Sequence, residues 1–260
     1  MKQLKLTFLL SMLMSMVGLR VSAYTCKIDG ICYDLNSNNL MATVTYSGYP
    51  HNNEYTGAYG SSLAGKDVTI PSTISYNDEE YTVTAIGDNA FYDSESTVLM
   101  ASITIPSTVT SIGCQAFEKC TNLTSITIPS SVTNIGSSAF SGCLGLTTII
   151  IPNSVTNIGS SAFESTAWYN NKPDGMVYAG KVAYKYKGTM PDNTSIVIEE
   201  GTVSISPYAF HNCSGLTNVT IPNSVISIGE TAFCGCSSLT SVTIPNGVTS
   251  INKIIFSGCI

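Results

Sequence analysis

The sequence predicts a repeat solenoid of the mainly β class, with about seven coils of 23 residues and an N-terminal β cap. A 23-residue unit recurs in register, as SITIPSTVTSIGCQAFEKCTNLT from Ser102, SITIPSSVTNIGSSAFSGCLGLT from Ser125 and NVTIPNSVISIGETAFCGCSSLT from Asn218. A unit this short cannot bury its apolar face alone, so neighbouring units must stack around one core. The sequence before the first unit does not repeat, as expected of a cap that covers the first coil.

Residues 1–23 have the pattern of a secretory signal peptide. Lys2 and Lys5 precede an apolar run, and a small-residue cleavage site ends at Ala23. No stretch is long and apolar enough to favour a membrane span, so we expect no transmembrane span after signal removal. A lipid anchor on Cys26 is an alternative, although the residues before it do not resemble a lipoprotein cleavage box. We therefore expect a secreted or bacterial cell-surface protein.

The cap is predicted over residues 24–66 as a β-hairpin unit. Asp29-Gly30 is a two-residue turn signal between two short strands. In a hairpin with this turn, Cys26 faces Tyr33, and Cys32 lies diagonal to it. A disulfide between the two cysteines is therefore doubtful.

The solenoid is predicted over residues 67–260. With Ser102 as position 1, positions 1–4 alternate polar and apolar residues and predict a short strand that a proline ends. Positions 8–11 predict a second extended segment, and glycine at position 12 turns the chain. The predicted core positions are, in the first clean unit, Ile103, Ile105, Val109, Ile112, Ala116, Phe117, Cys120 and Leu123.

Cysteines recur at one core position of the repeat, which predicts a buried ladder of small apolar side chains. Its members are Cys120, Cys143, Cys213, Cys236 and Cys259. Stacking would also bring His211 and Cys234 near Cys213 and Cys236, and four such groups could bind zinc. Because two of these cysteines belong to the ladder and the other position is predicted to be exposed, we expect no metal site and no cofactor.

Two units are longer than the repeat. The first carries an insertion from Ser75 to Thr84, rich in strand formers around Asn77-Asp78. The fourth carries 24 extra residues within 164–194, since its proline Pro152 is followed 47 residues later, not 23, by the equivalent Glu199. We expect this second insertion to form a hairpin or a distorted coil on the side of the solenoid.

The fourth-unit insertion is the main candidate binding site, because aromatic residues with cationic neighbours are typical of contact surfaces. The alternative is that the aromatic residues cover the solenoid where its pattern breaks. The candidates are Trp168, Tyr169, Lys172, Tyr178, Lys181, Tyr184, Lys185, Tyr186 and Lys187.

The outward position of the first predicted strand gives a second set of candidates. Threonine holds this position in most coils, as in Thr127 and Thr220. Ile150 and Val197 replace it beside the insertion and form a small apolar spot, although ordinary variation among β-branched residues would give the same pattern.

Charge and composition exclude several function classes. The chain has 11 Lys+Arg and 17 Asp+Glu, and three basic residues leave with residues 1–23, so the mature charge is 8 − 17 = −9. An acidic body argues against nucleic acid, which needs a basic footprint. Two histidines and the absence of known catalytic motifs leave little room for acid–base or nucleophilic chemistry, so we expect no enzyme activity.

The unit from Leu123 to Cys143 closely resembles the BspA-like leucine-rich repeat, also called the Treponema-type repeat. Leu123-x-x-Ile126-x-Ile128 matches its strand signature, and the resemblance covers about residues 67–260. Residues 166–175 and 177–188 also resemble an insertion common in secreted members from gut and oral bacteria. The resemblance implies a curved right-handed solenoid with a parallel sheet on its concave side. It also implies secreted or surface proteins that bind host matrix proteins or other cells, without catalytic residues.

The sequence therefore favours an adhesin-like interaction module. The expected partner is a host extracellular-matrix or cell-surface protein or glycan. The alternative is a structural module of a larger surface protein, because the last coil stops at Ile260 without a cap and departs from the repeat, with Ile255 in place of alanine. Self-association at this C-terminal edge is part of that alternative.

Overall fold

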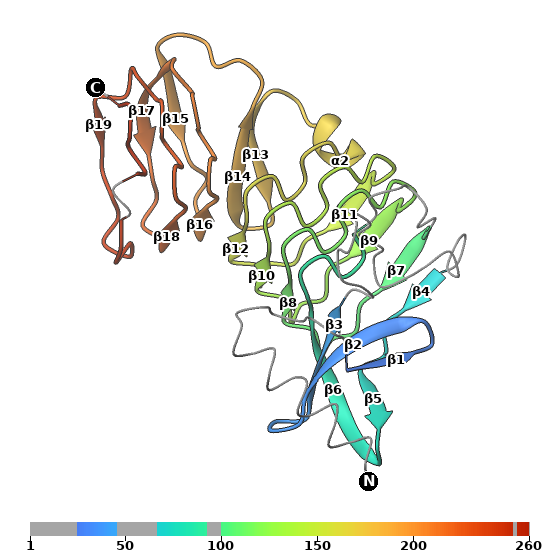
Figure 1. Cartoon of the computed structure of the whole chain (residues 1–260). Helices are drawn as coiled ribbons and strands as arrows, with labels where there is room; N and C mark the ends of the chain where they lie inside the picture. Colours follow the sequence, from blue (N-terminus) through green and yellow to red (C-terminus); the bar gives the residue numbers. More distant parts are fainter. Residues whose placement is uncertain (1–24, 46–66, 93–99, 252–253, 260) are drawn as a thin grey trace, which may run out of the picture.

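The structure, a computed structural model, describes residues 25–45, 67–92, 100–251 and 254–259 (Figure 1). The chain forms a β-solenoid of about 7 turns of roughly 23 residues, which confirms the predicted fold class. The predicted signal peptide lies outside the described residues. Within the described ranges, no helix is long and apolar enough to cross a membrane.

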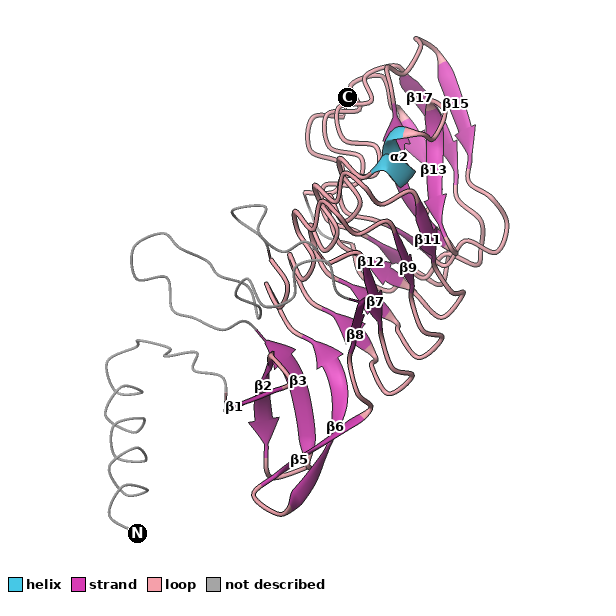
Figure 2. Cartoon of the chain, turned by 90° about the vertical axis from the view of Figure 1, so that its right-hand side faces the viewer, coloured by secondary structure: helices cyan, strands magenta, loops and turns pink. Residues whose placement is uncertain are grey.

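A first row of parallel strands runs along the solenoid (Figure 2). Neighbouring coils pair in register, as Ser125 does with Thr148 and Ile126 with Ile149. The strands of this row are β4 (Asp67–Thr69), β7 (Ser102–Thr104), β9 (Ser125–Thr127), β11 (Thr148–Ile150), β15 (Thr194–Val197), β17 (Leu216–Thr220) and β19 (Ser241–Val242).

A second row of two-residue strands forms the opposite wall of each coil. Its members are β8 (Ser111–Ile112), β10 (Asn134–Ile135), β12 (Asn157–Ile158), β16 (Ser204–Ile205) and β18 (Ser227–Ile228). The glycine that follows each of the first three strands permits close stacking. A Cβ added at Gly136 would lie 2.5 Å from the backbone nitrogen of Cys114 and 2.5 Å from the carbonyl carbon of Gly113. Coil spacing at this point therefore depends on the missing side chain.

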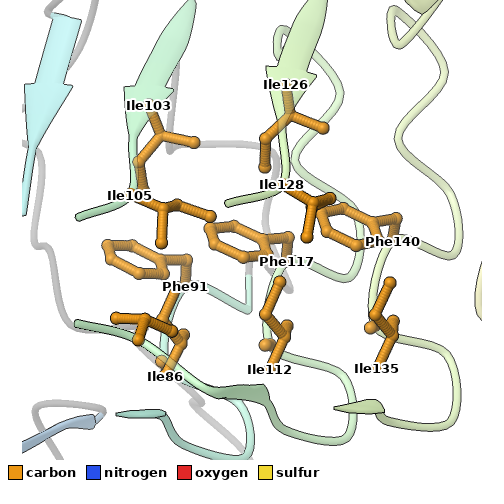
Figure 3. Packing of buried hydrophobic residues seen from close by; sticks show 14 of the residues in the cluster. Ile86, Phe91, Ile103, Ile105, Ile112, Phe117, Ile126, Ile128, Ile135 and Phe140 are labelled. Atoms are coloured by element: carbon orange, nitrogen blue, oxygen red, sulfur yellow. The ribbon is translucent and has the colours of Figure 1, made fainter. Parts of the chain in front are cut away.

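The core lies between the two rows, and all eight predicted core residues of the first clean unit are buried. Figure 3 shows isoleucines of both rows meeting a line of phenylalanine rings. The rings of Phe91 and Phe117 stack at 5.0 Å between centroids, and those of Phe117 and Phe140 at 5.2 Å. Each coil thus repeats the contacts of the coil before it.

The cysteine ladder is confirmed as part of the core. Four of its members are buried and Cys259 is half-buried. The Cys143 thiol donates to the carbonyl oxygen of Phe117 at 3.0 Å, and the Cys236 thiol to that of Phe210 at 3.0 Å. Burial raises the pKa of the Cys236 thiol to about 12, so it stays protonated as a donor.

Before the first coil, β1 (Cys26–Ile28), β2 (Ile31–Asn36) and β3 (Met41–Thr45) form an antiparallel meander. Cys26 pairs with Tyr33 and Lys27 with Cys32, which confirms the predicted register. The rest of the predicted cap, residues 46–66, lies outside the described residues.

The insertion of the first coil is a hairpin of β5 (Thr73–Tyr76) and β6 (Glu79–Ile86). Its turn residues Asn77 and Asp78 have φ angles of 52° and 65°, as a two-residue hairpin turn requires. β6 pairs with both β3 and β8, so this hairpin joins the meander to the second row.

Candidate binding surface

The insertion of the fourth coil is built into the stack. It contains the short helix α2 (Ala167–Asn170), then β13 (Gly175–Ala179) and β14 (Val182–Lys187), which form an antiparallel hairpin. β14 pairs in parallel with β16 and so extends the second row of the last coils. The predicted hairpin is present, but its predicted place on the side of the solenoid is corrected: it lies between coils four and five (Figure 1).

This hairpin separates two hydrophobic cores, and we call it the septum hairpin. The side chains of Val177, Ala179, Val182 and Tyr184 pack into the core of the coils before it. On the other face, Ala183 packs into the core of the coils after it, together with Met176, Tyr178 and Tyr186. Both faces of the hairpin are therefore occupied by apolar packing.

The first row is interrupted at the same place, and we call this break the seam. β11 ends a two-stranded sheet with β9, and β15 begins a separate sheet with β17 and β19. β13, which lies between them along the chain, pairs with β14 alone. Within the described residues, three strands therefore have one unpaired edge at the seam.

Two aromatic residues predicted to contact a ligand are inside the protein. Tyr169 and Tyr184 are 5% and 1% exposed, so their predicted role at the surface is corrected. The Tyr184 hydroxyl accepts a hydrogen bond from the backbone nitrogen of Phe163 at 3.0 Å. The Tyr184 and Trp168 rings meet the Phe163 ring edge-on at 5.3 Å and 5.1 Å, where the next stacked phenylalanine would otherwise lie. These residues close the phenylalanine line of the first block of coils.

The predicted lysine cluster is largely engaged within the protein. Lys185 pairs with Glu164 at 2.7 Å. The Lys187 ammonium donates to the carbonyl oxygen of Asn170 at 2.7 Å and to that of Lys172, at the C-terminal end of α2. Lys172 itself lies over the Trp168 ring, 4.7 Å from its centroid.

The other residues of the insertion are more accessible. Lys181 is exposed, and Trp168, Tyr178 and Tyr186 are half-buried. The Tyr178 hydroxyl accepts a hydrogen bond from the backbone nitrogen of Glu199 at 3.0 Å and thereby joins the septum hairpin to the fifth coil. The aromatic and basic residues that were predicted to form one surface cluster are therefore partly buried in the core and partly exposed.

The outward strand residues lie where the repeat predicts them. Thr127 and Thr220 are exposed, and Ile150 and Val197 are 57% and 75% exposed. These two apolar side chains belong to β11 and β15 and therefore flank the seam from both sides.

A hollow of about 250 Å³ lies along β13 and the residues just before it. Residues that the sequence did not single out form most of its wall. The sequence feature that could have identified them is the apolar pattern on both faces of the hairpin strands. A strand that is apolar on both faces is typically buried on both faces. The lining residues are Lys172, Pro173, Asp174, Met176, Val177 and Tyr178.

The histidine and cysteines that were considered as metal ligands have other contacts. The ring of the exposed His211 meets that of Tyr208 at 5.4 Å, while Cys213 and Cys236 belong to the buried ladder. Among the described residues, no three His, Cys, Asp or Glu side chains gather as a metal site. His51 lies outside those residues.

Comparison with known proteins gives the relationships of the chain. The sequence pattern described as BspA type leucine rich repeat region matches residues 84–181 and 181–260. A leucine-rich repeat protein from Bacteroides ovatus ATCC 8483 has 30% identity and a TM-score of 0.50, with 90% of this chain and 51% of that chain covered. A leucine-rich cell surface protein from Faecalibacterium prausnitzii A2-165 has 24% identity and a TM-score of 0.36, with 90% and 86% covered.

The chain spans about half the length of the Bacteroides ovatus protein. No curated protein matches the chain. The match to the repeat pattern covers most of the coils described above. The chain belongs to the family of BspA-type leucine-rich repeat proteins.

Proposed function

We propose that the chain is an adhesin-like binding protein, secreted or held on a bacterial cell surface, and that it has no catalytic activity. Its partner is a host extracellular-matrix protein or a cell-surface protein or glycan. The membership in the repeat family and the signal-peptide pattern of residues 1–23 support this function.

The observation that carries the proposal is the exposed face of the first row at the seam. A solenoid presents a long surface on which many weak contacts add up, which suits a macromolecule better than a small metabolite. Ile150 and Val197 replace threonine on this face and expose branched aliphatic side chains on the two strands that flank the seam. Exposed apolar surface is a common feature of interaction sites. The outward residues of the row carry no group that titrates near neutral pH, which supports binding without catalysis.

The test is a binding measurement on the chain without residues 1–23. The purified protein is passed over immobilised extracellular-matrix proteins and over epithelial cell-surface glycoproteins. We expect saturable binding to at least one of these immobilised proteins. The double variant Ile150→Thr, Val197→Thr should weaken that binding, whereas Ile226→Thr should not. Ile226 is a matched control, because it is 57% exposed, as Ile150 is, and follows Val225 away from the seam. Absence of saturable binding to every surface would overturn the proposal.

A second candidate function is assembly through the last described coil. A hollow of about 250 Å³ opens there between core residues that have no further coil against them in the described part of the chain, among them Leu239, Val242, Ile244 and Phe256. A second copy or a further coil would cover these side chains. Light scattering across a concentration series tests this function: an increase in mass that Val242→Lys abolishes supports it, and a constant monomer mass contradicts it.

A further inference from the structure

At the seam, the strands of the first row on the two sides belong to separate sheets. The insertion adds 24 residues, which is about the length of one coil, and it supplies the second row with β14. The first row gains no partner from it, because β13 folds back and pairs with β14. In consequence β11 and β15 are not joined to each other or to β13 by strand pairing.

We propose that the seam binds an extended peptide segment of the partner protein, which adds as a strand to the unpaired edge of β13. This inference rests on the proposed binding function and names its mode. The unpaired edge of β13 offers backbone donors and acceptors that an extended chain can satisfy. The hollow along residues 172–178 leaves room beside β13 for such a chain.

The side chains around the seam define the chemistry of the segment. Ile150 and Val197 flank it with exposed aliphatic surface, so aliphatic side chains at alternate positions of the segment find apolar contacts. Glu199 and Glu200 are exposed just beyond β15. On a chain with a mature charge of −9, these carboxylates favour a lysine or arginine at the end of the segment that lies beside them. The occupant is therefore an extended, aliphatic and basic segment rather than a glycan.

Trp168 provides a reporter for this site. It is the single tryptophan of the chain and lies in contact with Lys172, which lines the hollow. A segment that enters the hollow changes the surroundings of Lys172 and hence those of the Trp168 ring. Tryptophan emission therefore measures occupancy of the seam directly.

The probe is an acetylated and amidated peptide that copies residues 123–128 between two lysines, KLTSITIK. In the chain itself this sequence contains β9, which pairs in parallel with β11 of the first row. Two matched control peptides have the same side chains. Each carries N-methylated amides at alternate residues, so that one edge of the extended peptide is blocked in the first control and the opposite edge in the second. Tryptophan emission is titrated with each peptide, and amide hydrogen exchange is measured over residues 149–151, 175–179 and 195–197.

Saturable binding of the probe with new exchange protection at residues 175–179 is the expected result. N-methylation on the edge that faces β13 should abolish binding, and Ile150→Thr with Val197→Thr should weaken it about tenfold. Ile226→Thr should leave binding within about twofold of the unmodified chain. Equal binding of all peptides, or protection away from the seam, would overturn strand addition. If the macromolecular partner binds through Ile150 and Val197 while the probe does not, strand addition is wrong and the proposed function stands; if neither binds, the proposed function fails as well.

Discussion

The regular coils from Ser102 to Phe163 and the septum hairpin after them bury apolar surface in different ways. In the regular coils each residue contacts its own equivalents in the next coil, as Phe117 does with Phe140. The septum hairpin and the helix α2 before it have no equivalent on either side, so Tyr184, Trp168 and Lys187 make contacts that occur once in the described chain. In the regular coils, the same side-chain contacts recur from coil to coil and form the core. At the septum hairpin, individual hydrogen bonds and edge-on ring contacts join the coils before it to the coils after it.

Removal of one ring from the line of stacked phenylalanines should lower the free energy of unfolding more than any other substitution proposed below. Phe140 is fully buried and stacks on Phe117 and Phe163 at 5.2 Å and 5.7 Å. Phe140→Ala should lower the free energy of unfolding by about 3–5 kcal/mol, since it leaves a cavity in both contacts. Urea denaturation followed by circular dichroism measures this loss. A loss below about 1 kcal/mol would mean that the line of rings does not hold the coils together.

Substitutions at the glycine position of the repeat should change stability differently in the regular coils and next to the septum hairpin. Gly136→Ala places a Cβ 2.5 Å from the backbone of the previous coil and should cost about 1–3 kcal/mol. Ser206 holds the same repeat position just after the septum hairpin, where it is 2% exposed and its hydroxyl has no hydrogen-bond partner. Ser206→Ala should therefore leave stability unchanged or raise it by up to about 1 kcal/mol. A loss in Ser206→Ala equal to that in Gly136→Ala would contradict the assignment of the Ser206 hydroxyl as a buried group without a partner.

The regular coils could be predicted from sequence to the level of single side chains. The 23-residue period fixes which residues face the core, so the eight core residues from Ile103 to Leu123 and the outward Ile150 and Val197 follow from position alone. The turn at Asp29-Gly30 likewise fixed the pairing of Cys26 with Tyr33.

The septum hairpin could not be predicted to that level, because it has no repeat partner that would fix its register. Its aromatic residues alternate between two buried faces, and lysines between them suggested a surface. The ammonium groups of Lys185 and Lys187 reach a carboxylate and two carbonyl oxygens, which is a tertiary arrangement that spacing does not reveal. The insertion length, close to one coil, was a signal for a place within the stack, whereas the insertion was predicted to lie on the side of the solenoid.

A single hydrogen bond joins the end of the phenylalanine line to the septum hairpin. Tyr184→Phe removes the hydroxyl that accepts from the backbone nitrogen of Phe163 and leaves that buried donor without its partner. The expected loss is about 1–2 kcal/mol, with the ring contacts kept. Hydrogen exchange of the Phe163 amide checks the mechanism, because its protection should fall while that of the Phe140 amide, bonded to Ala162, should persist. Unchanged exchange at Phe163 would contradict the assigned role of the hydroxyl.

The ion pair between the septum hairpin and the fourth coil should contribute least to stability. Lys185 and Glu164 meet at 2.7 Å, but their side chains are 33% and 38% exposed, so water and salt screen the attraction. Lys185→Gln should therefore cost less than about 1 kcal/mol, and most of that difference should vanish at high salt. Unfolding of both chains at low and high sodium chloride measures it. A larger loss that persists at high salt would mean that charge, and not the ring contacts and the Tyr184 hydrogen bond, joins the septum hairpin to the coils before it.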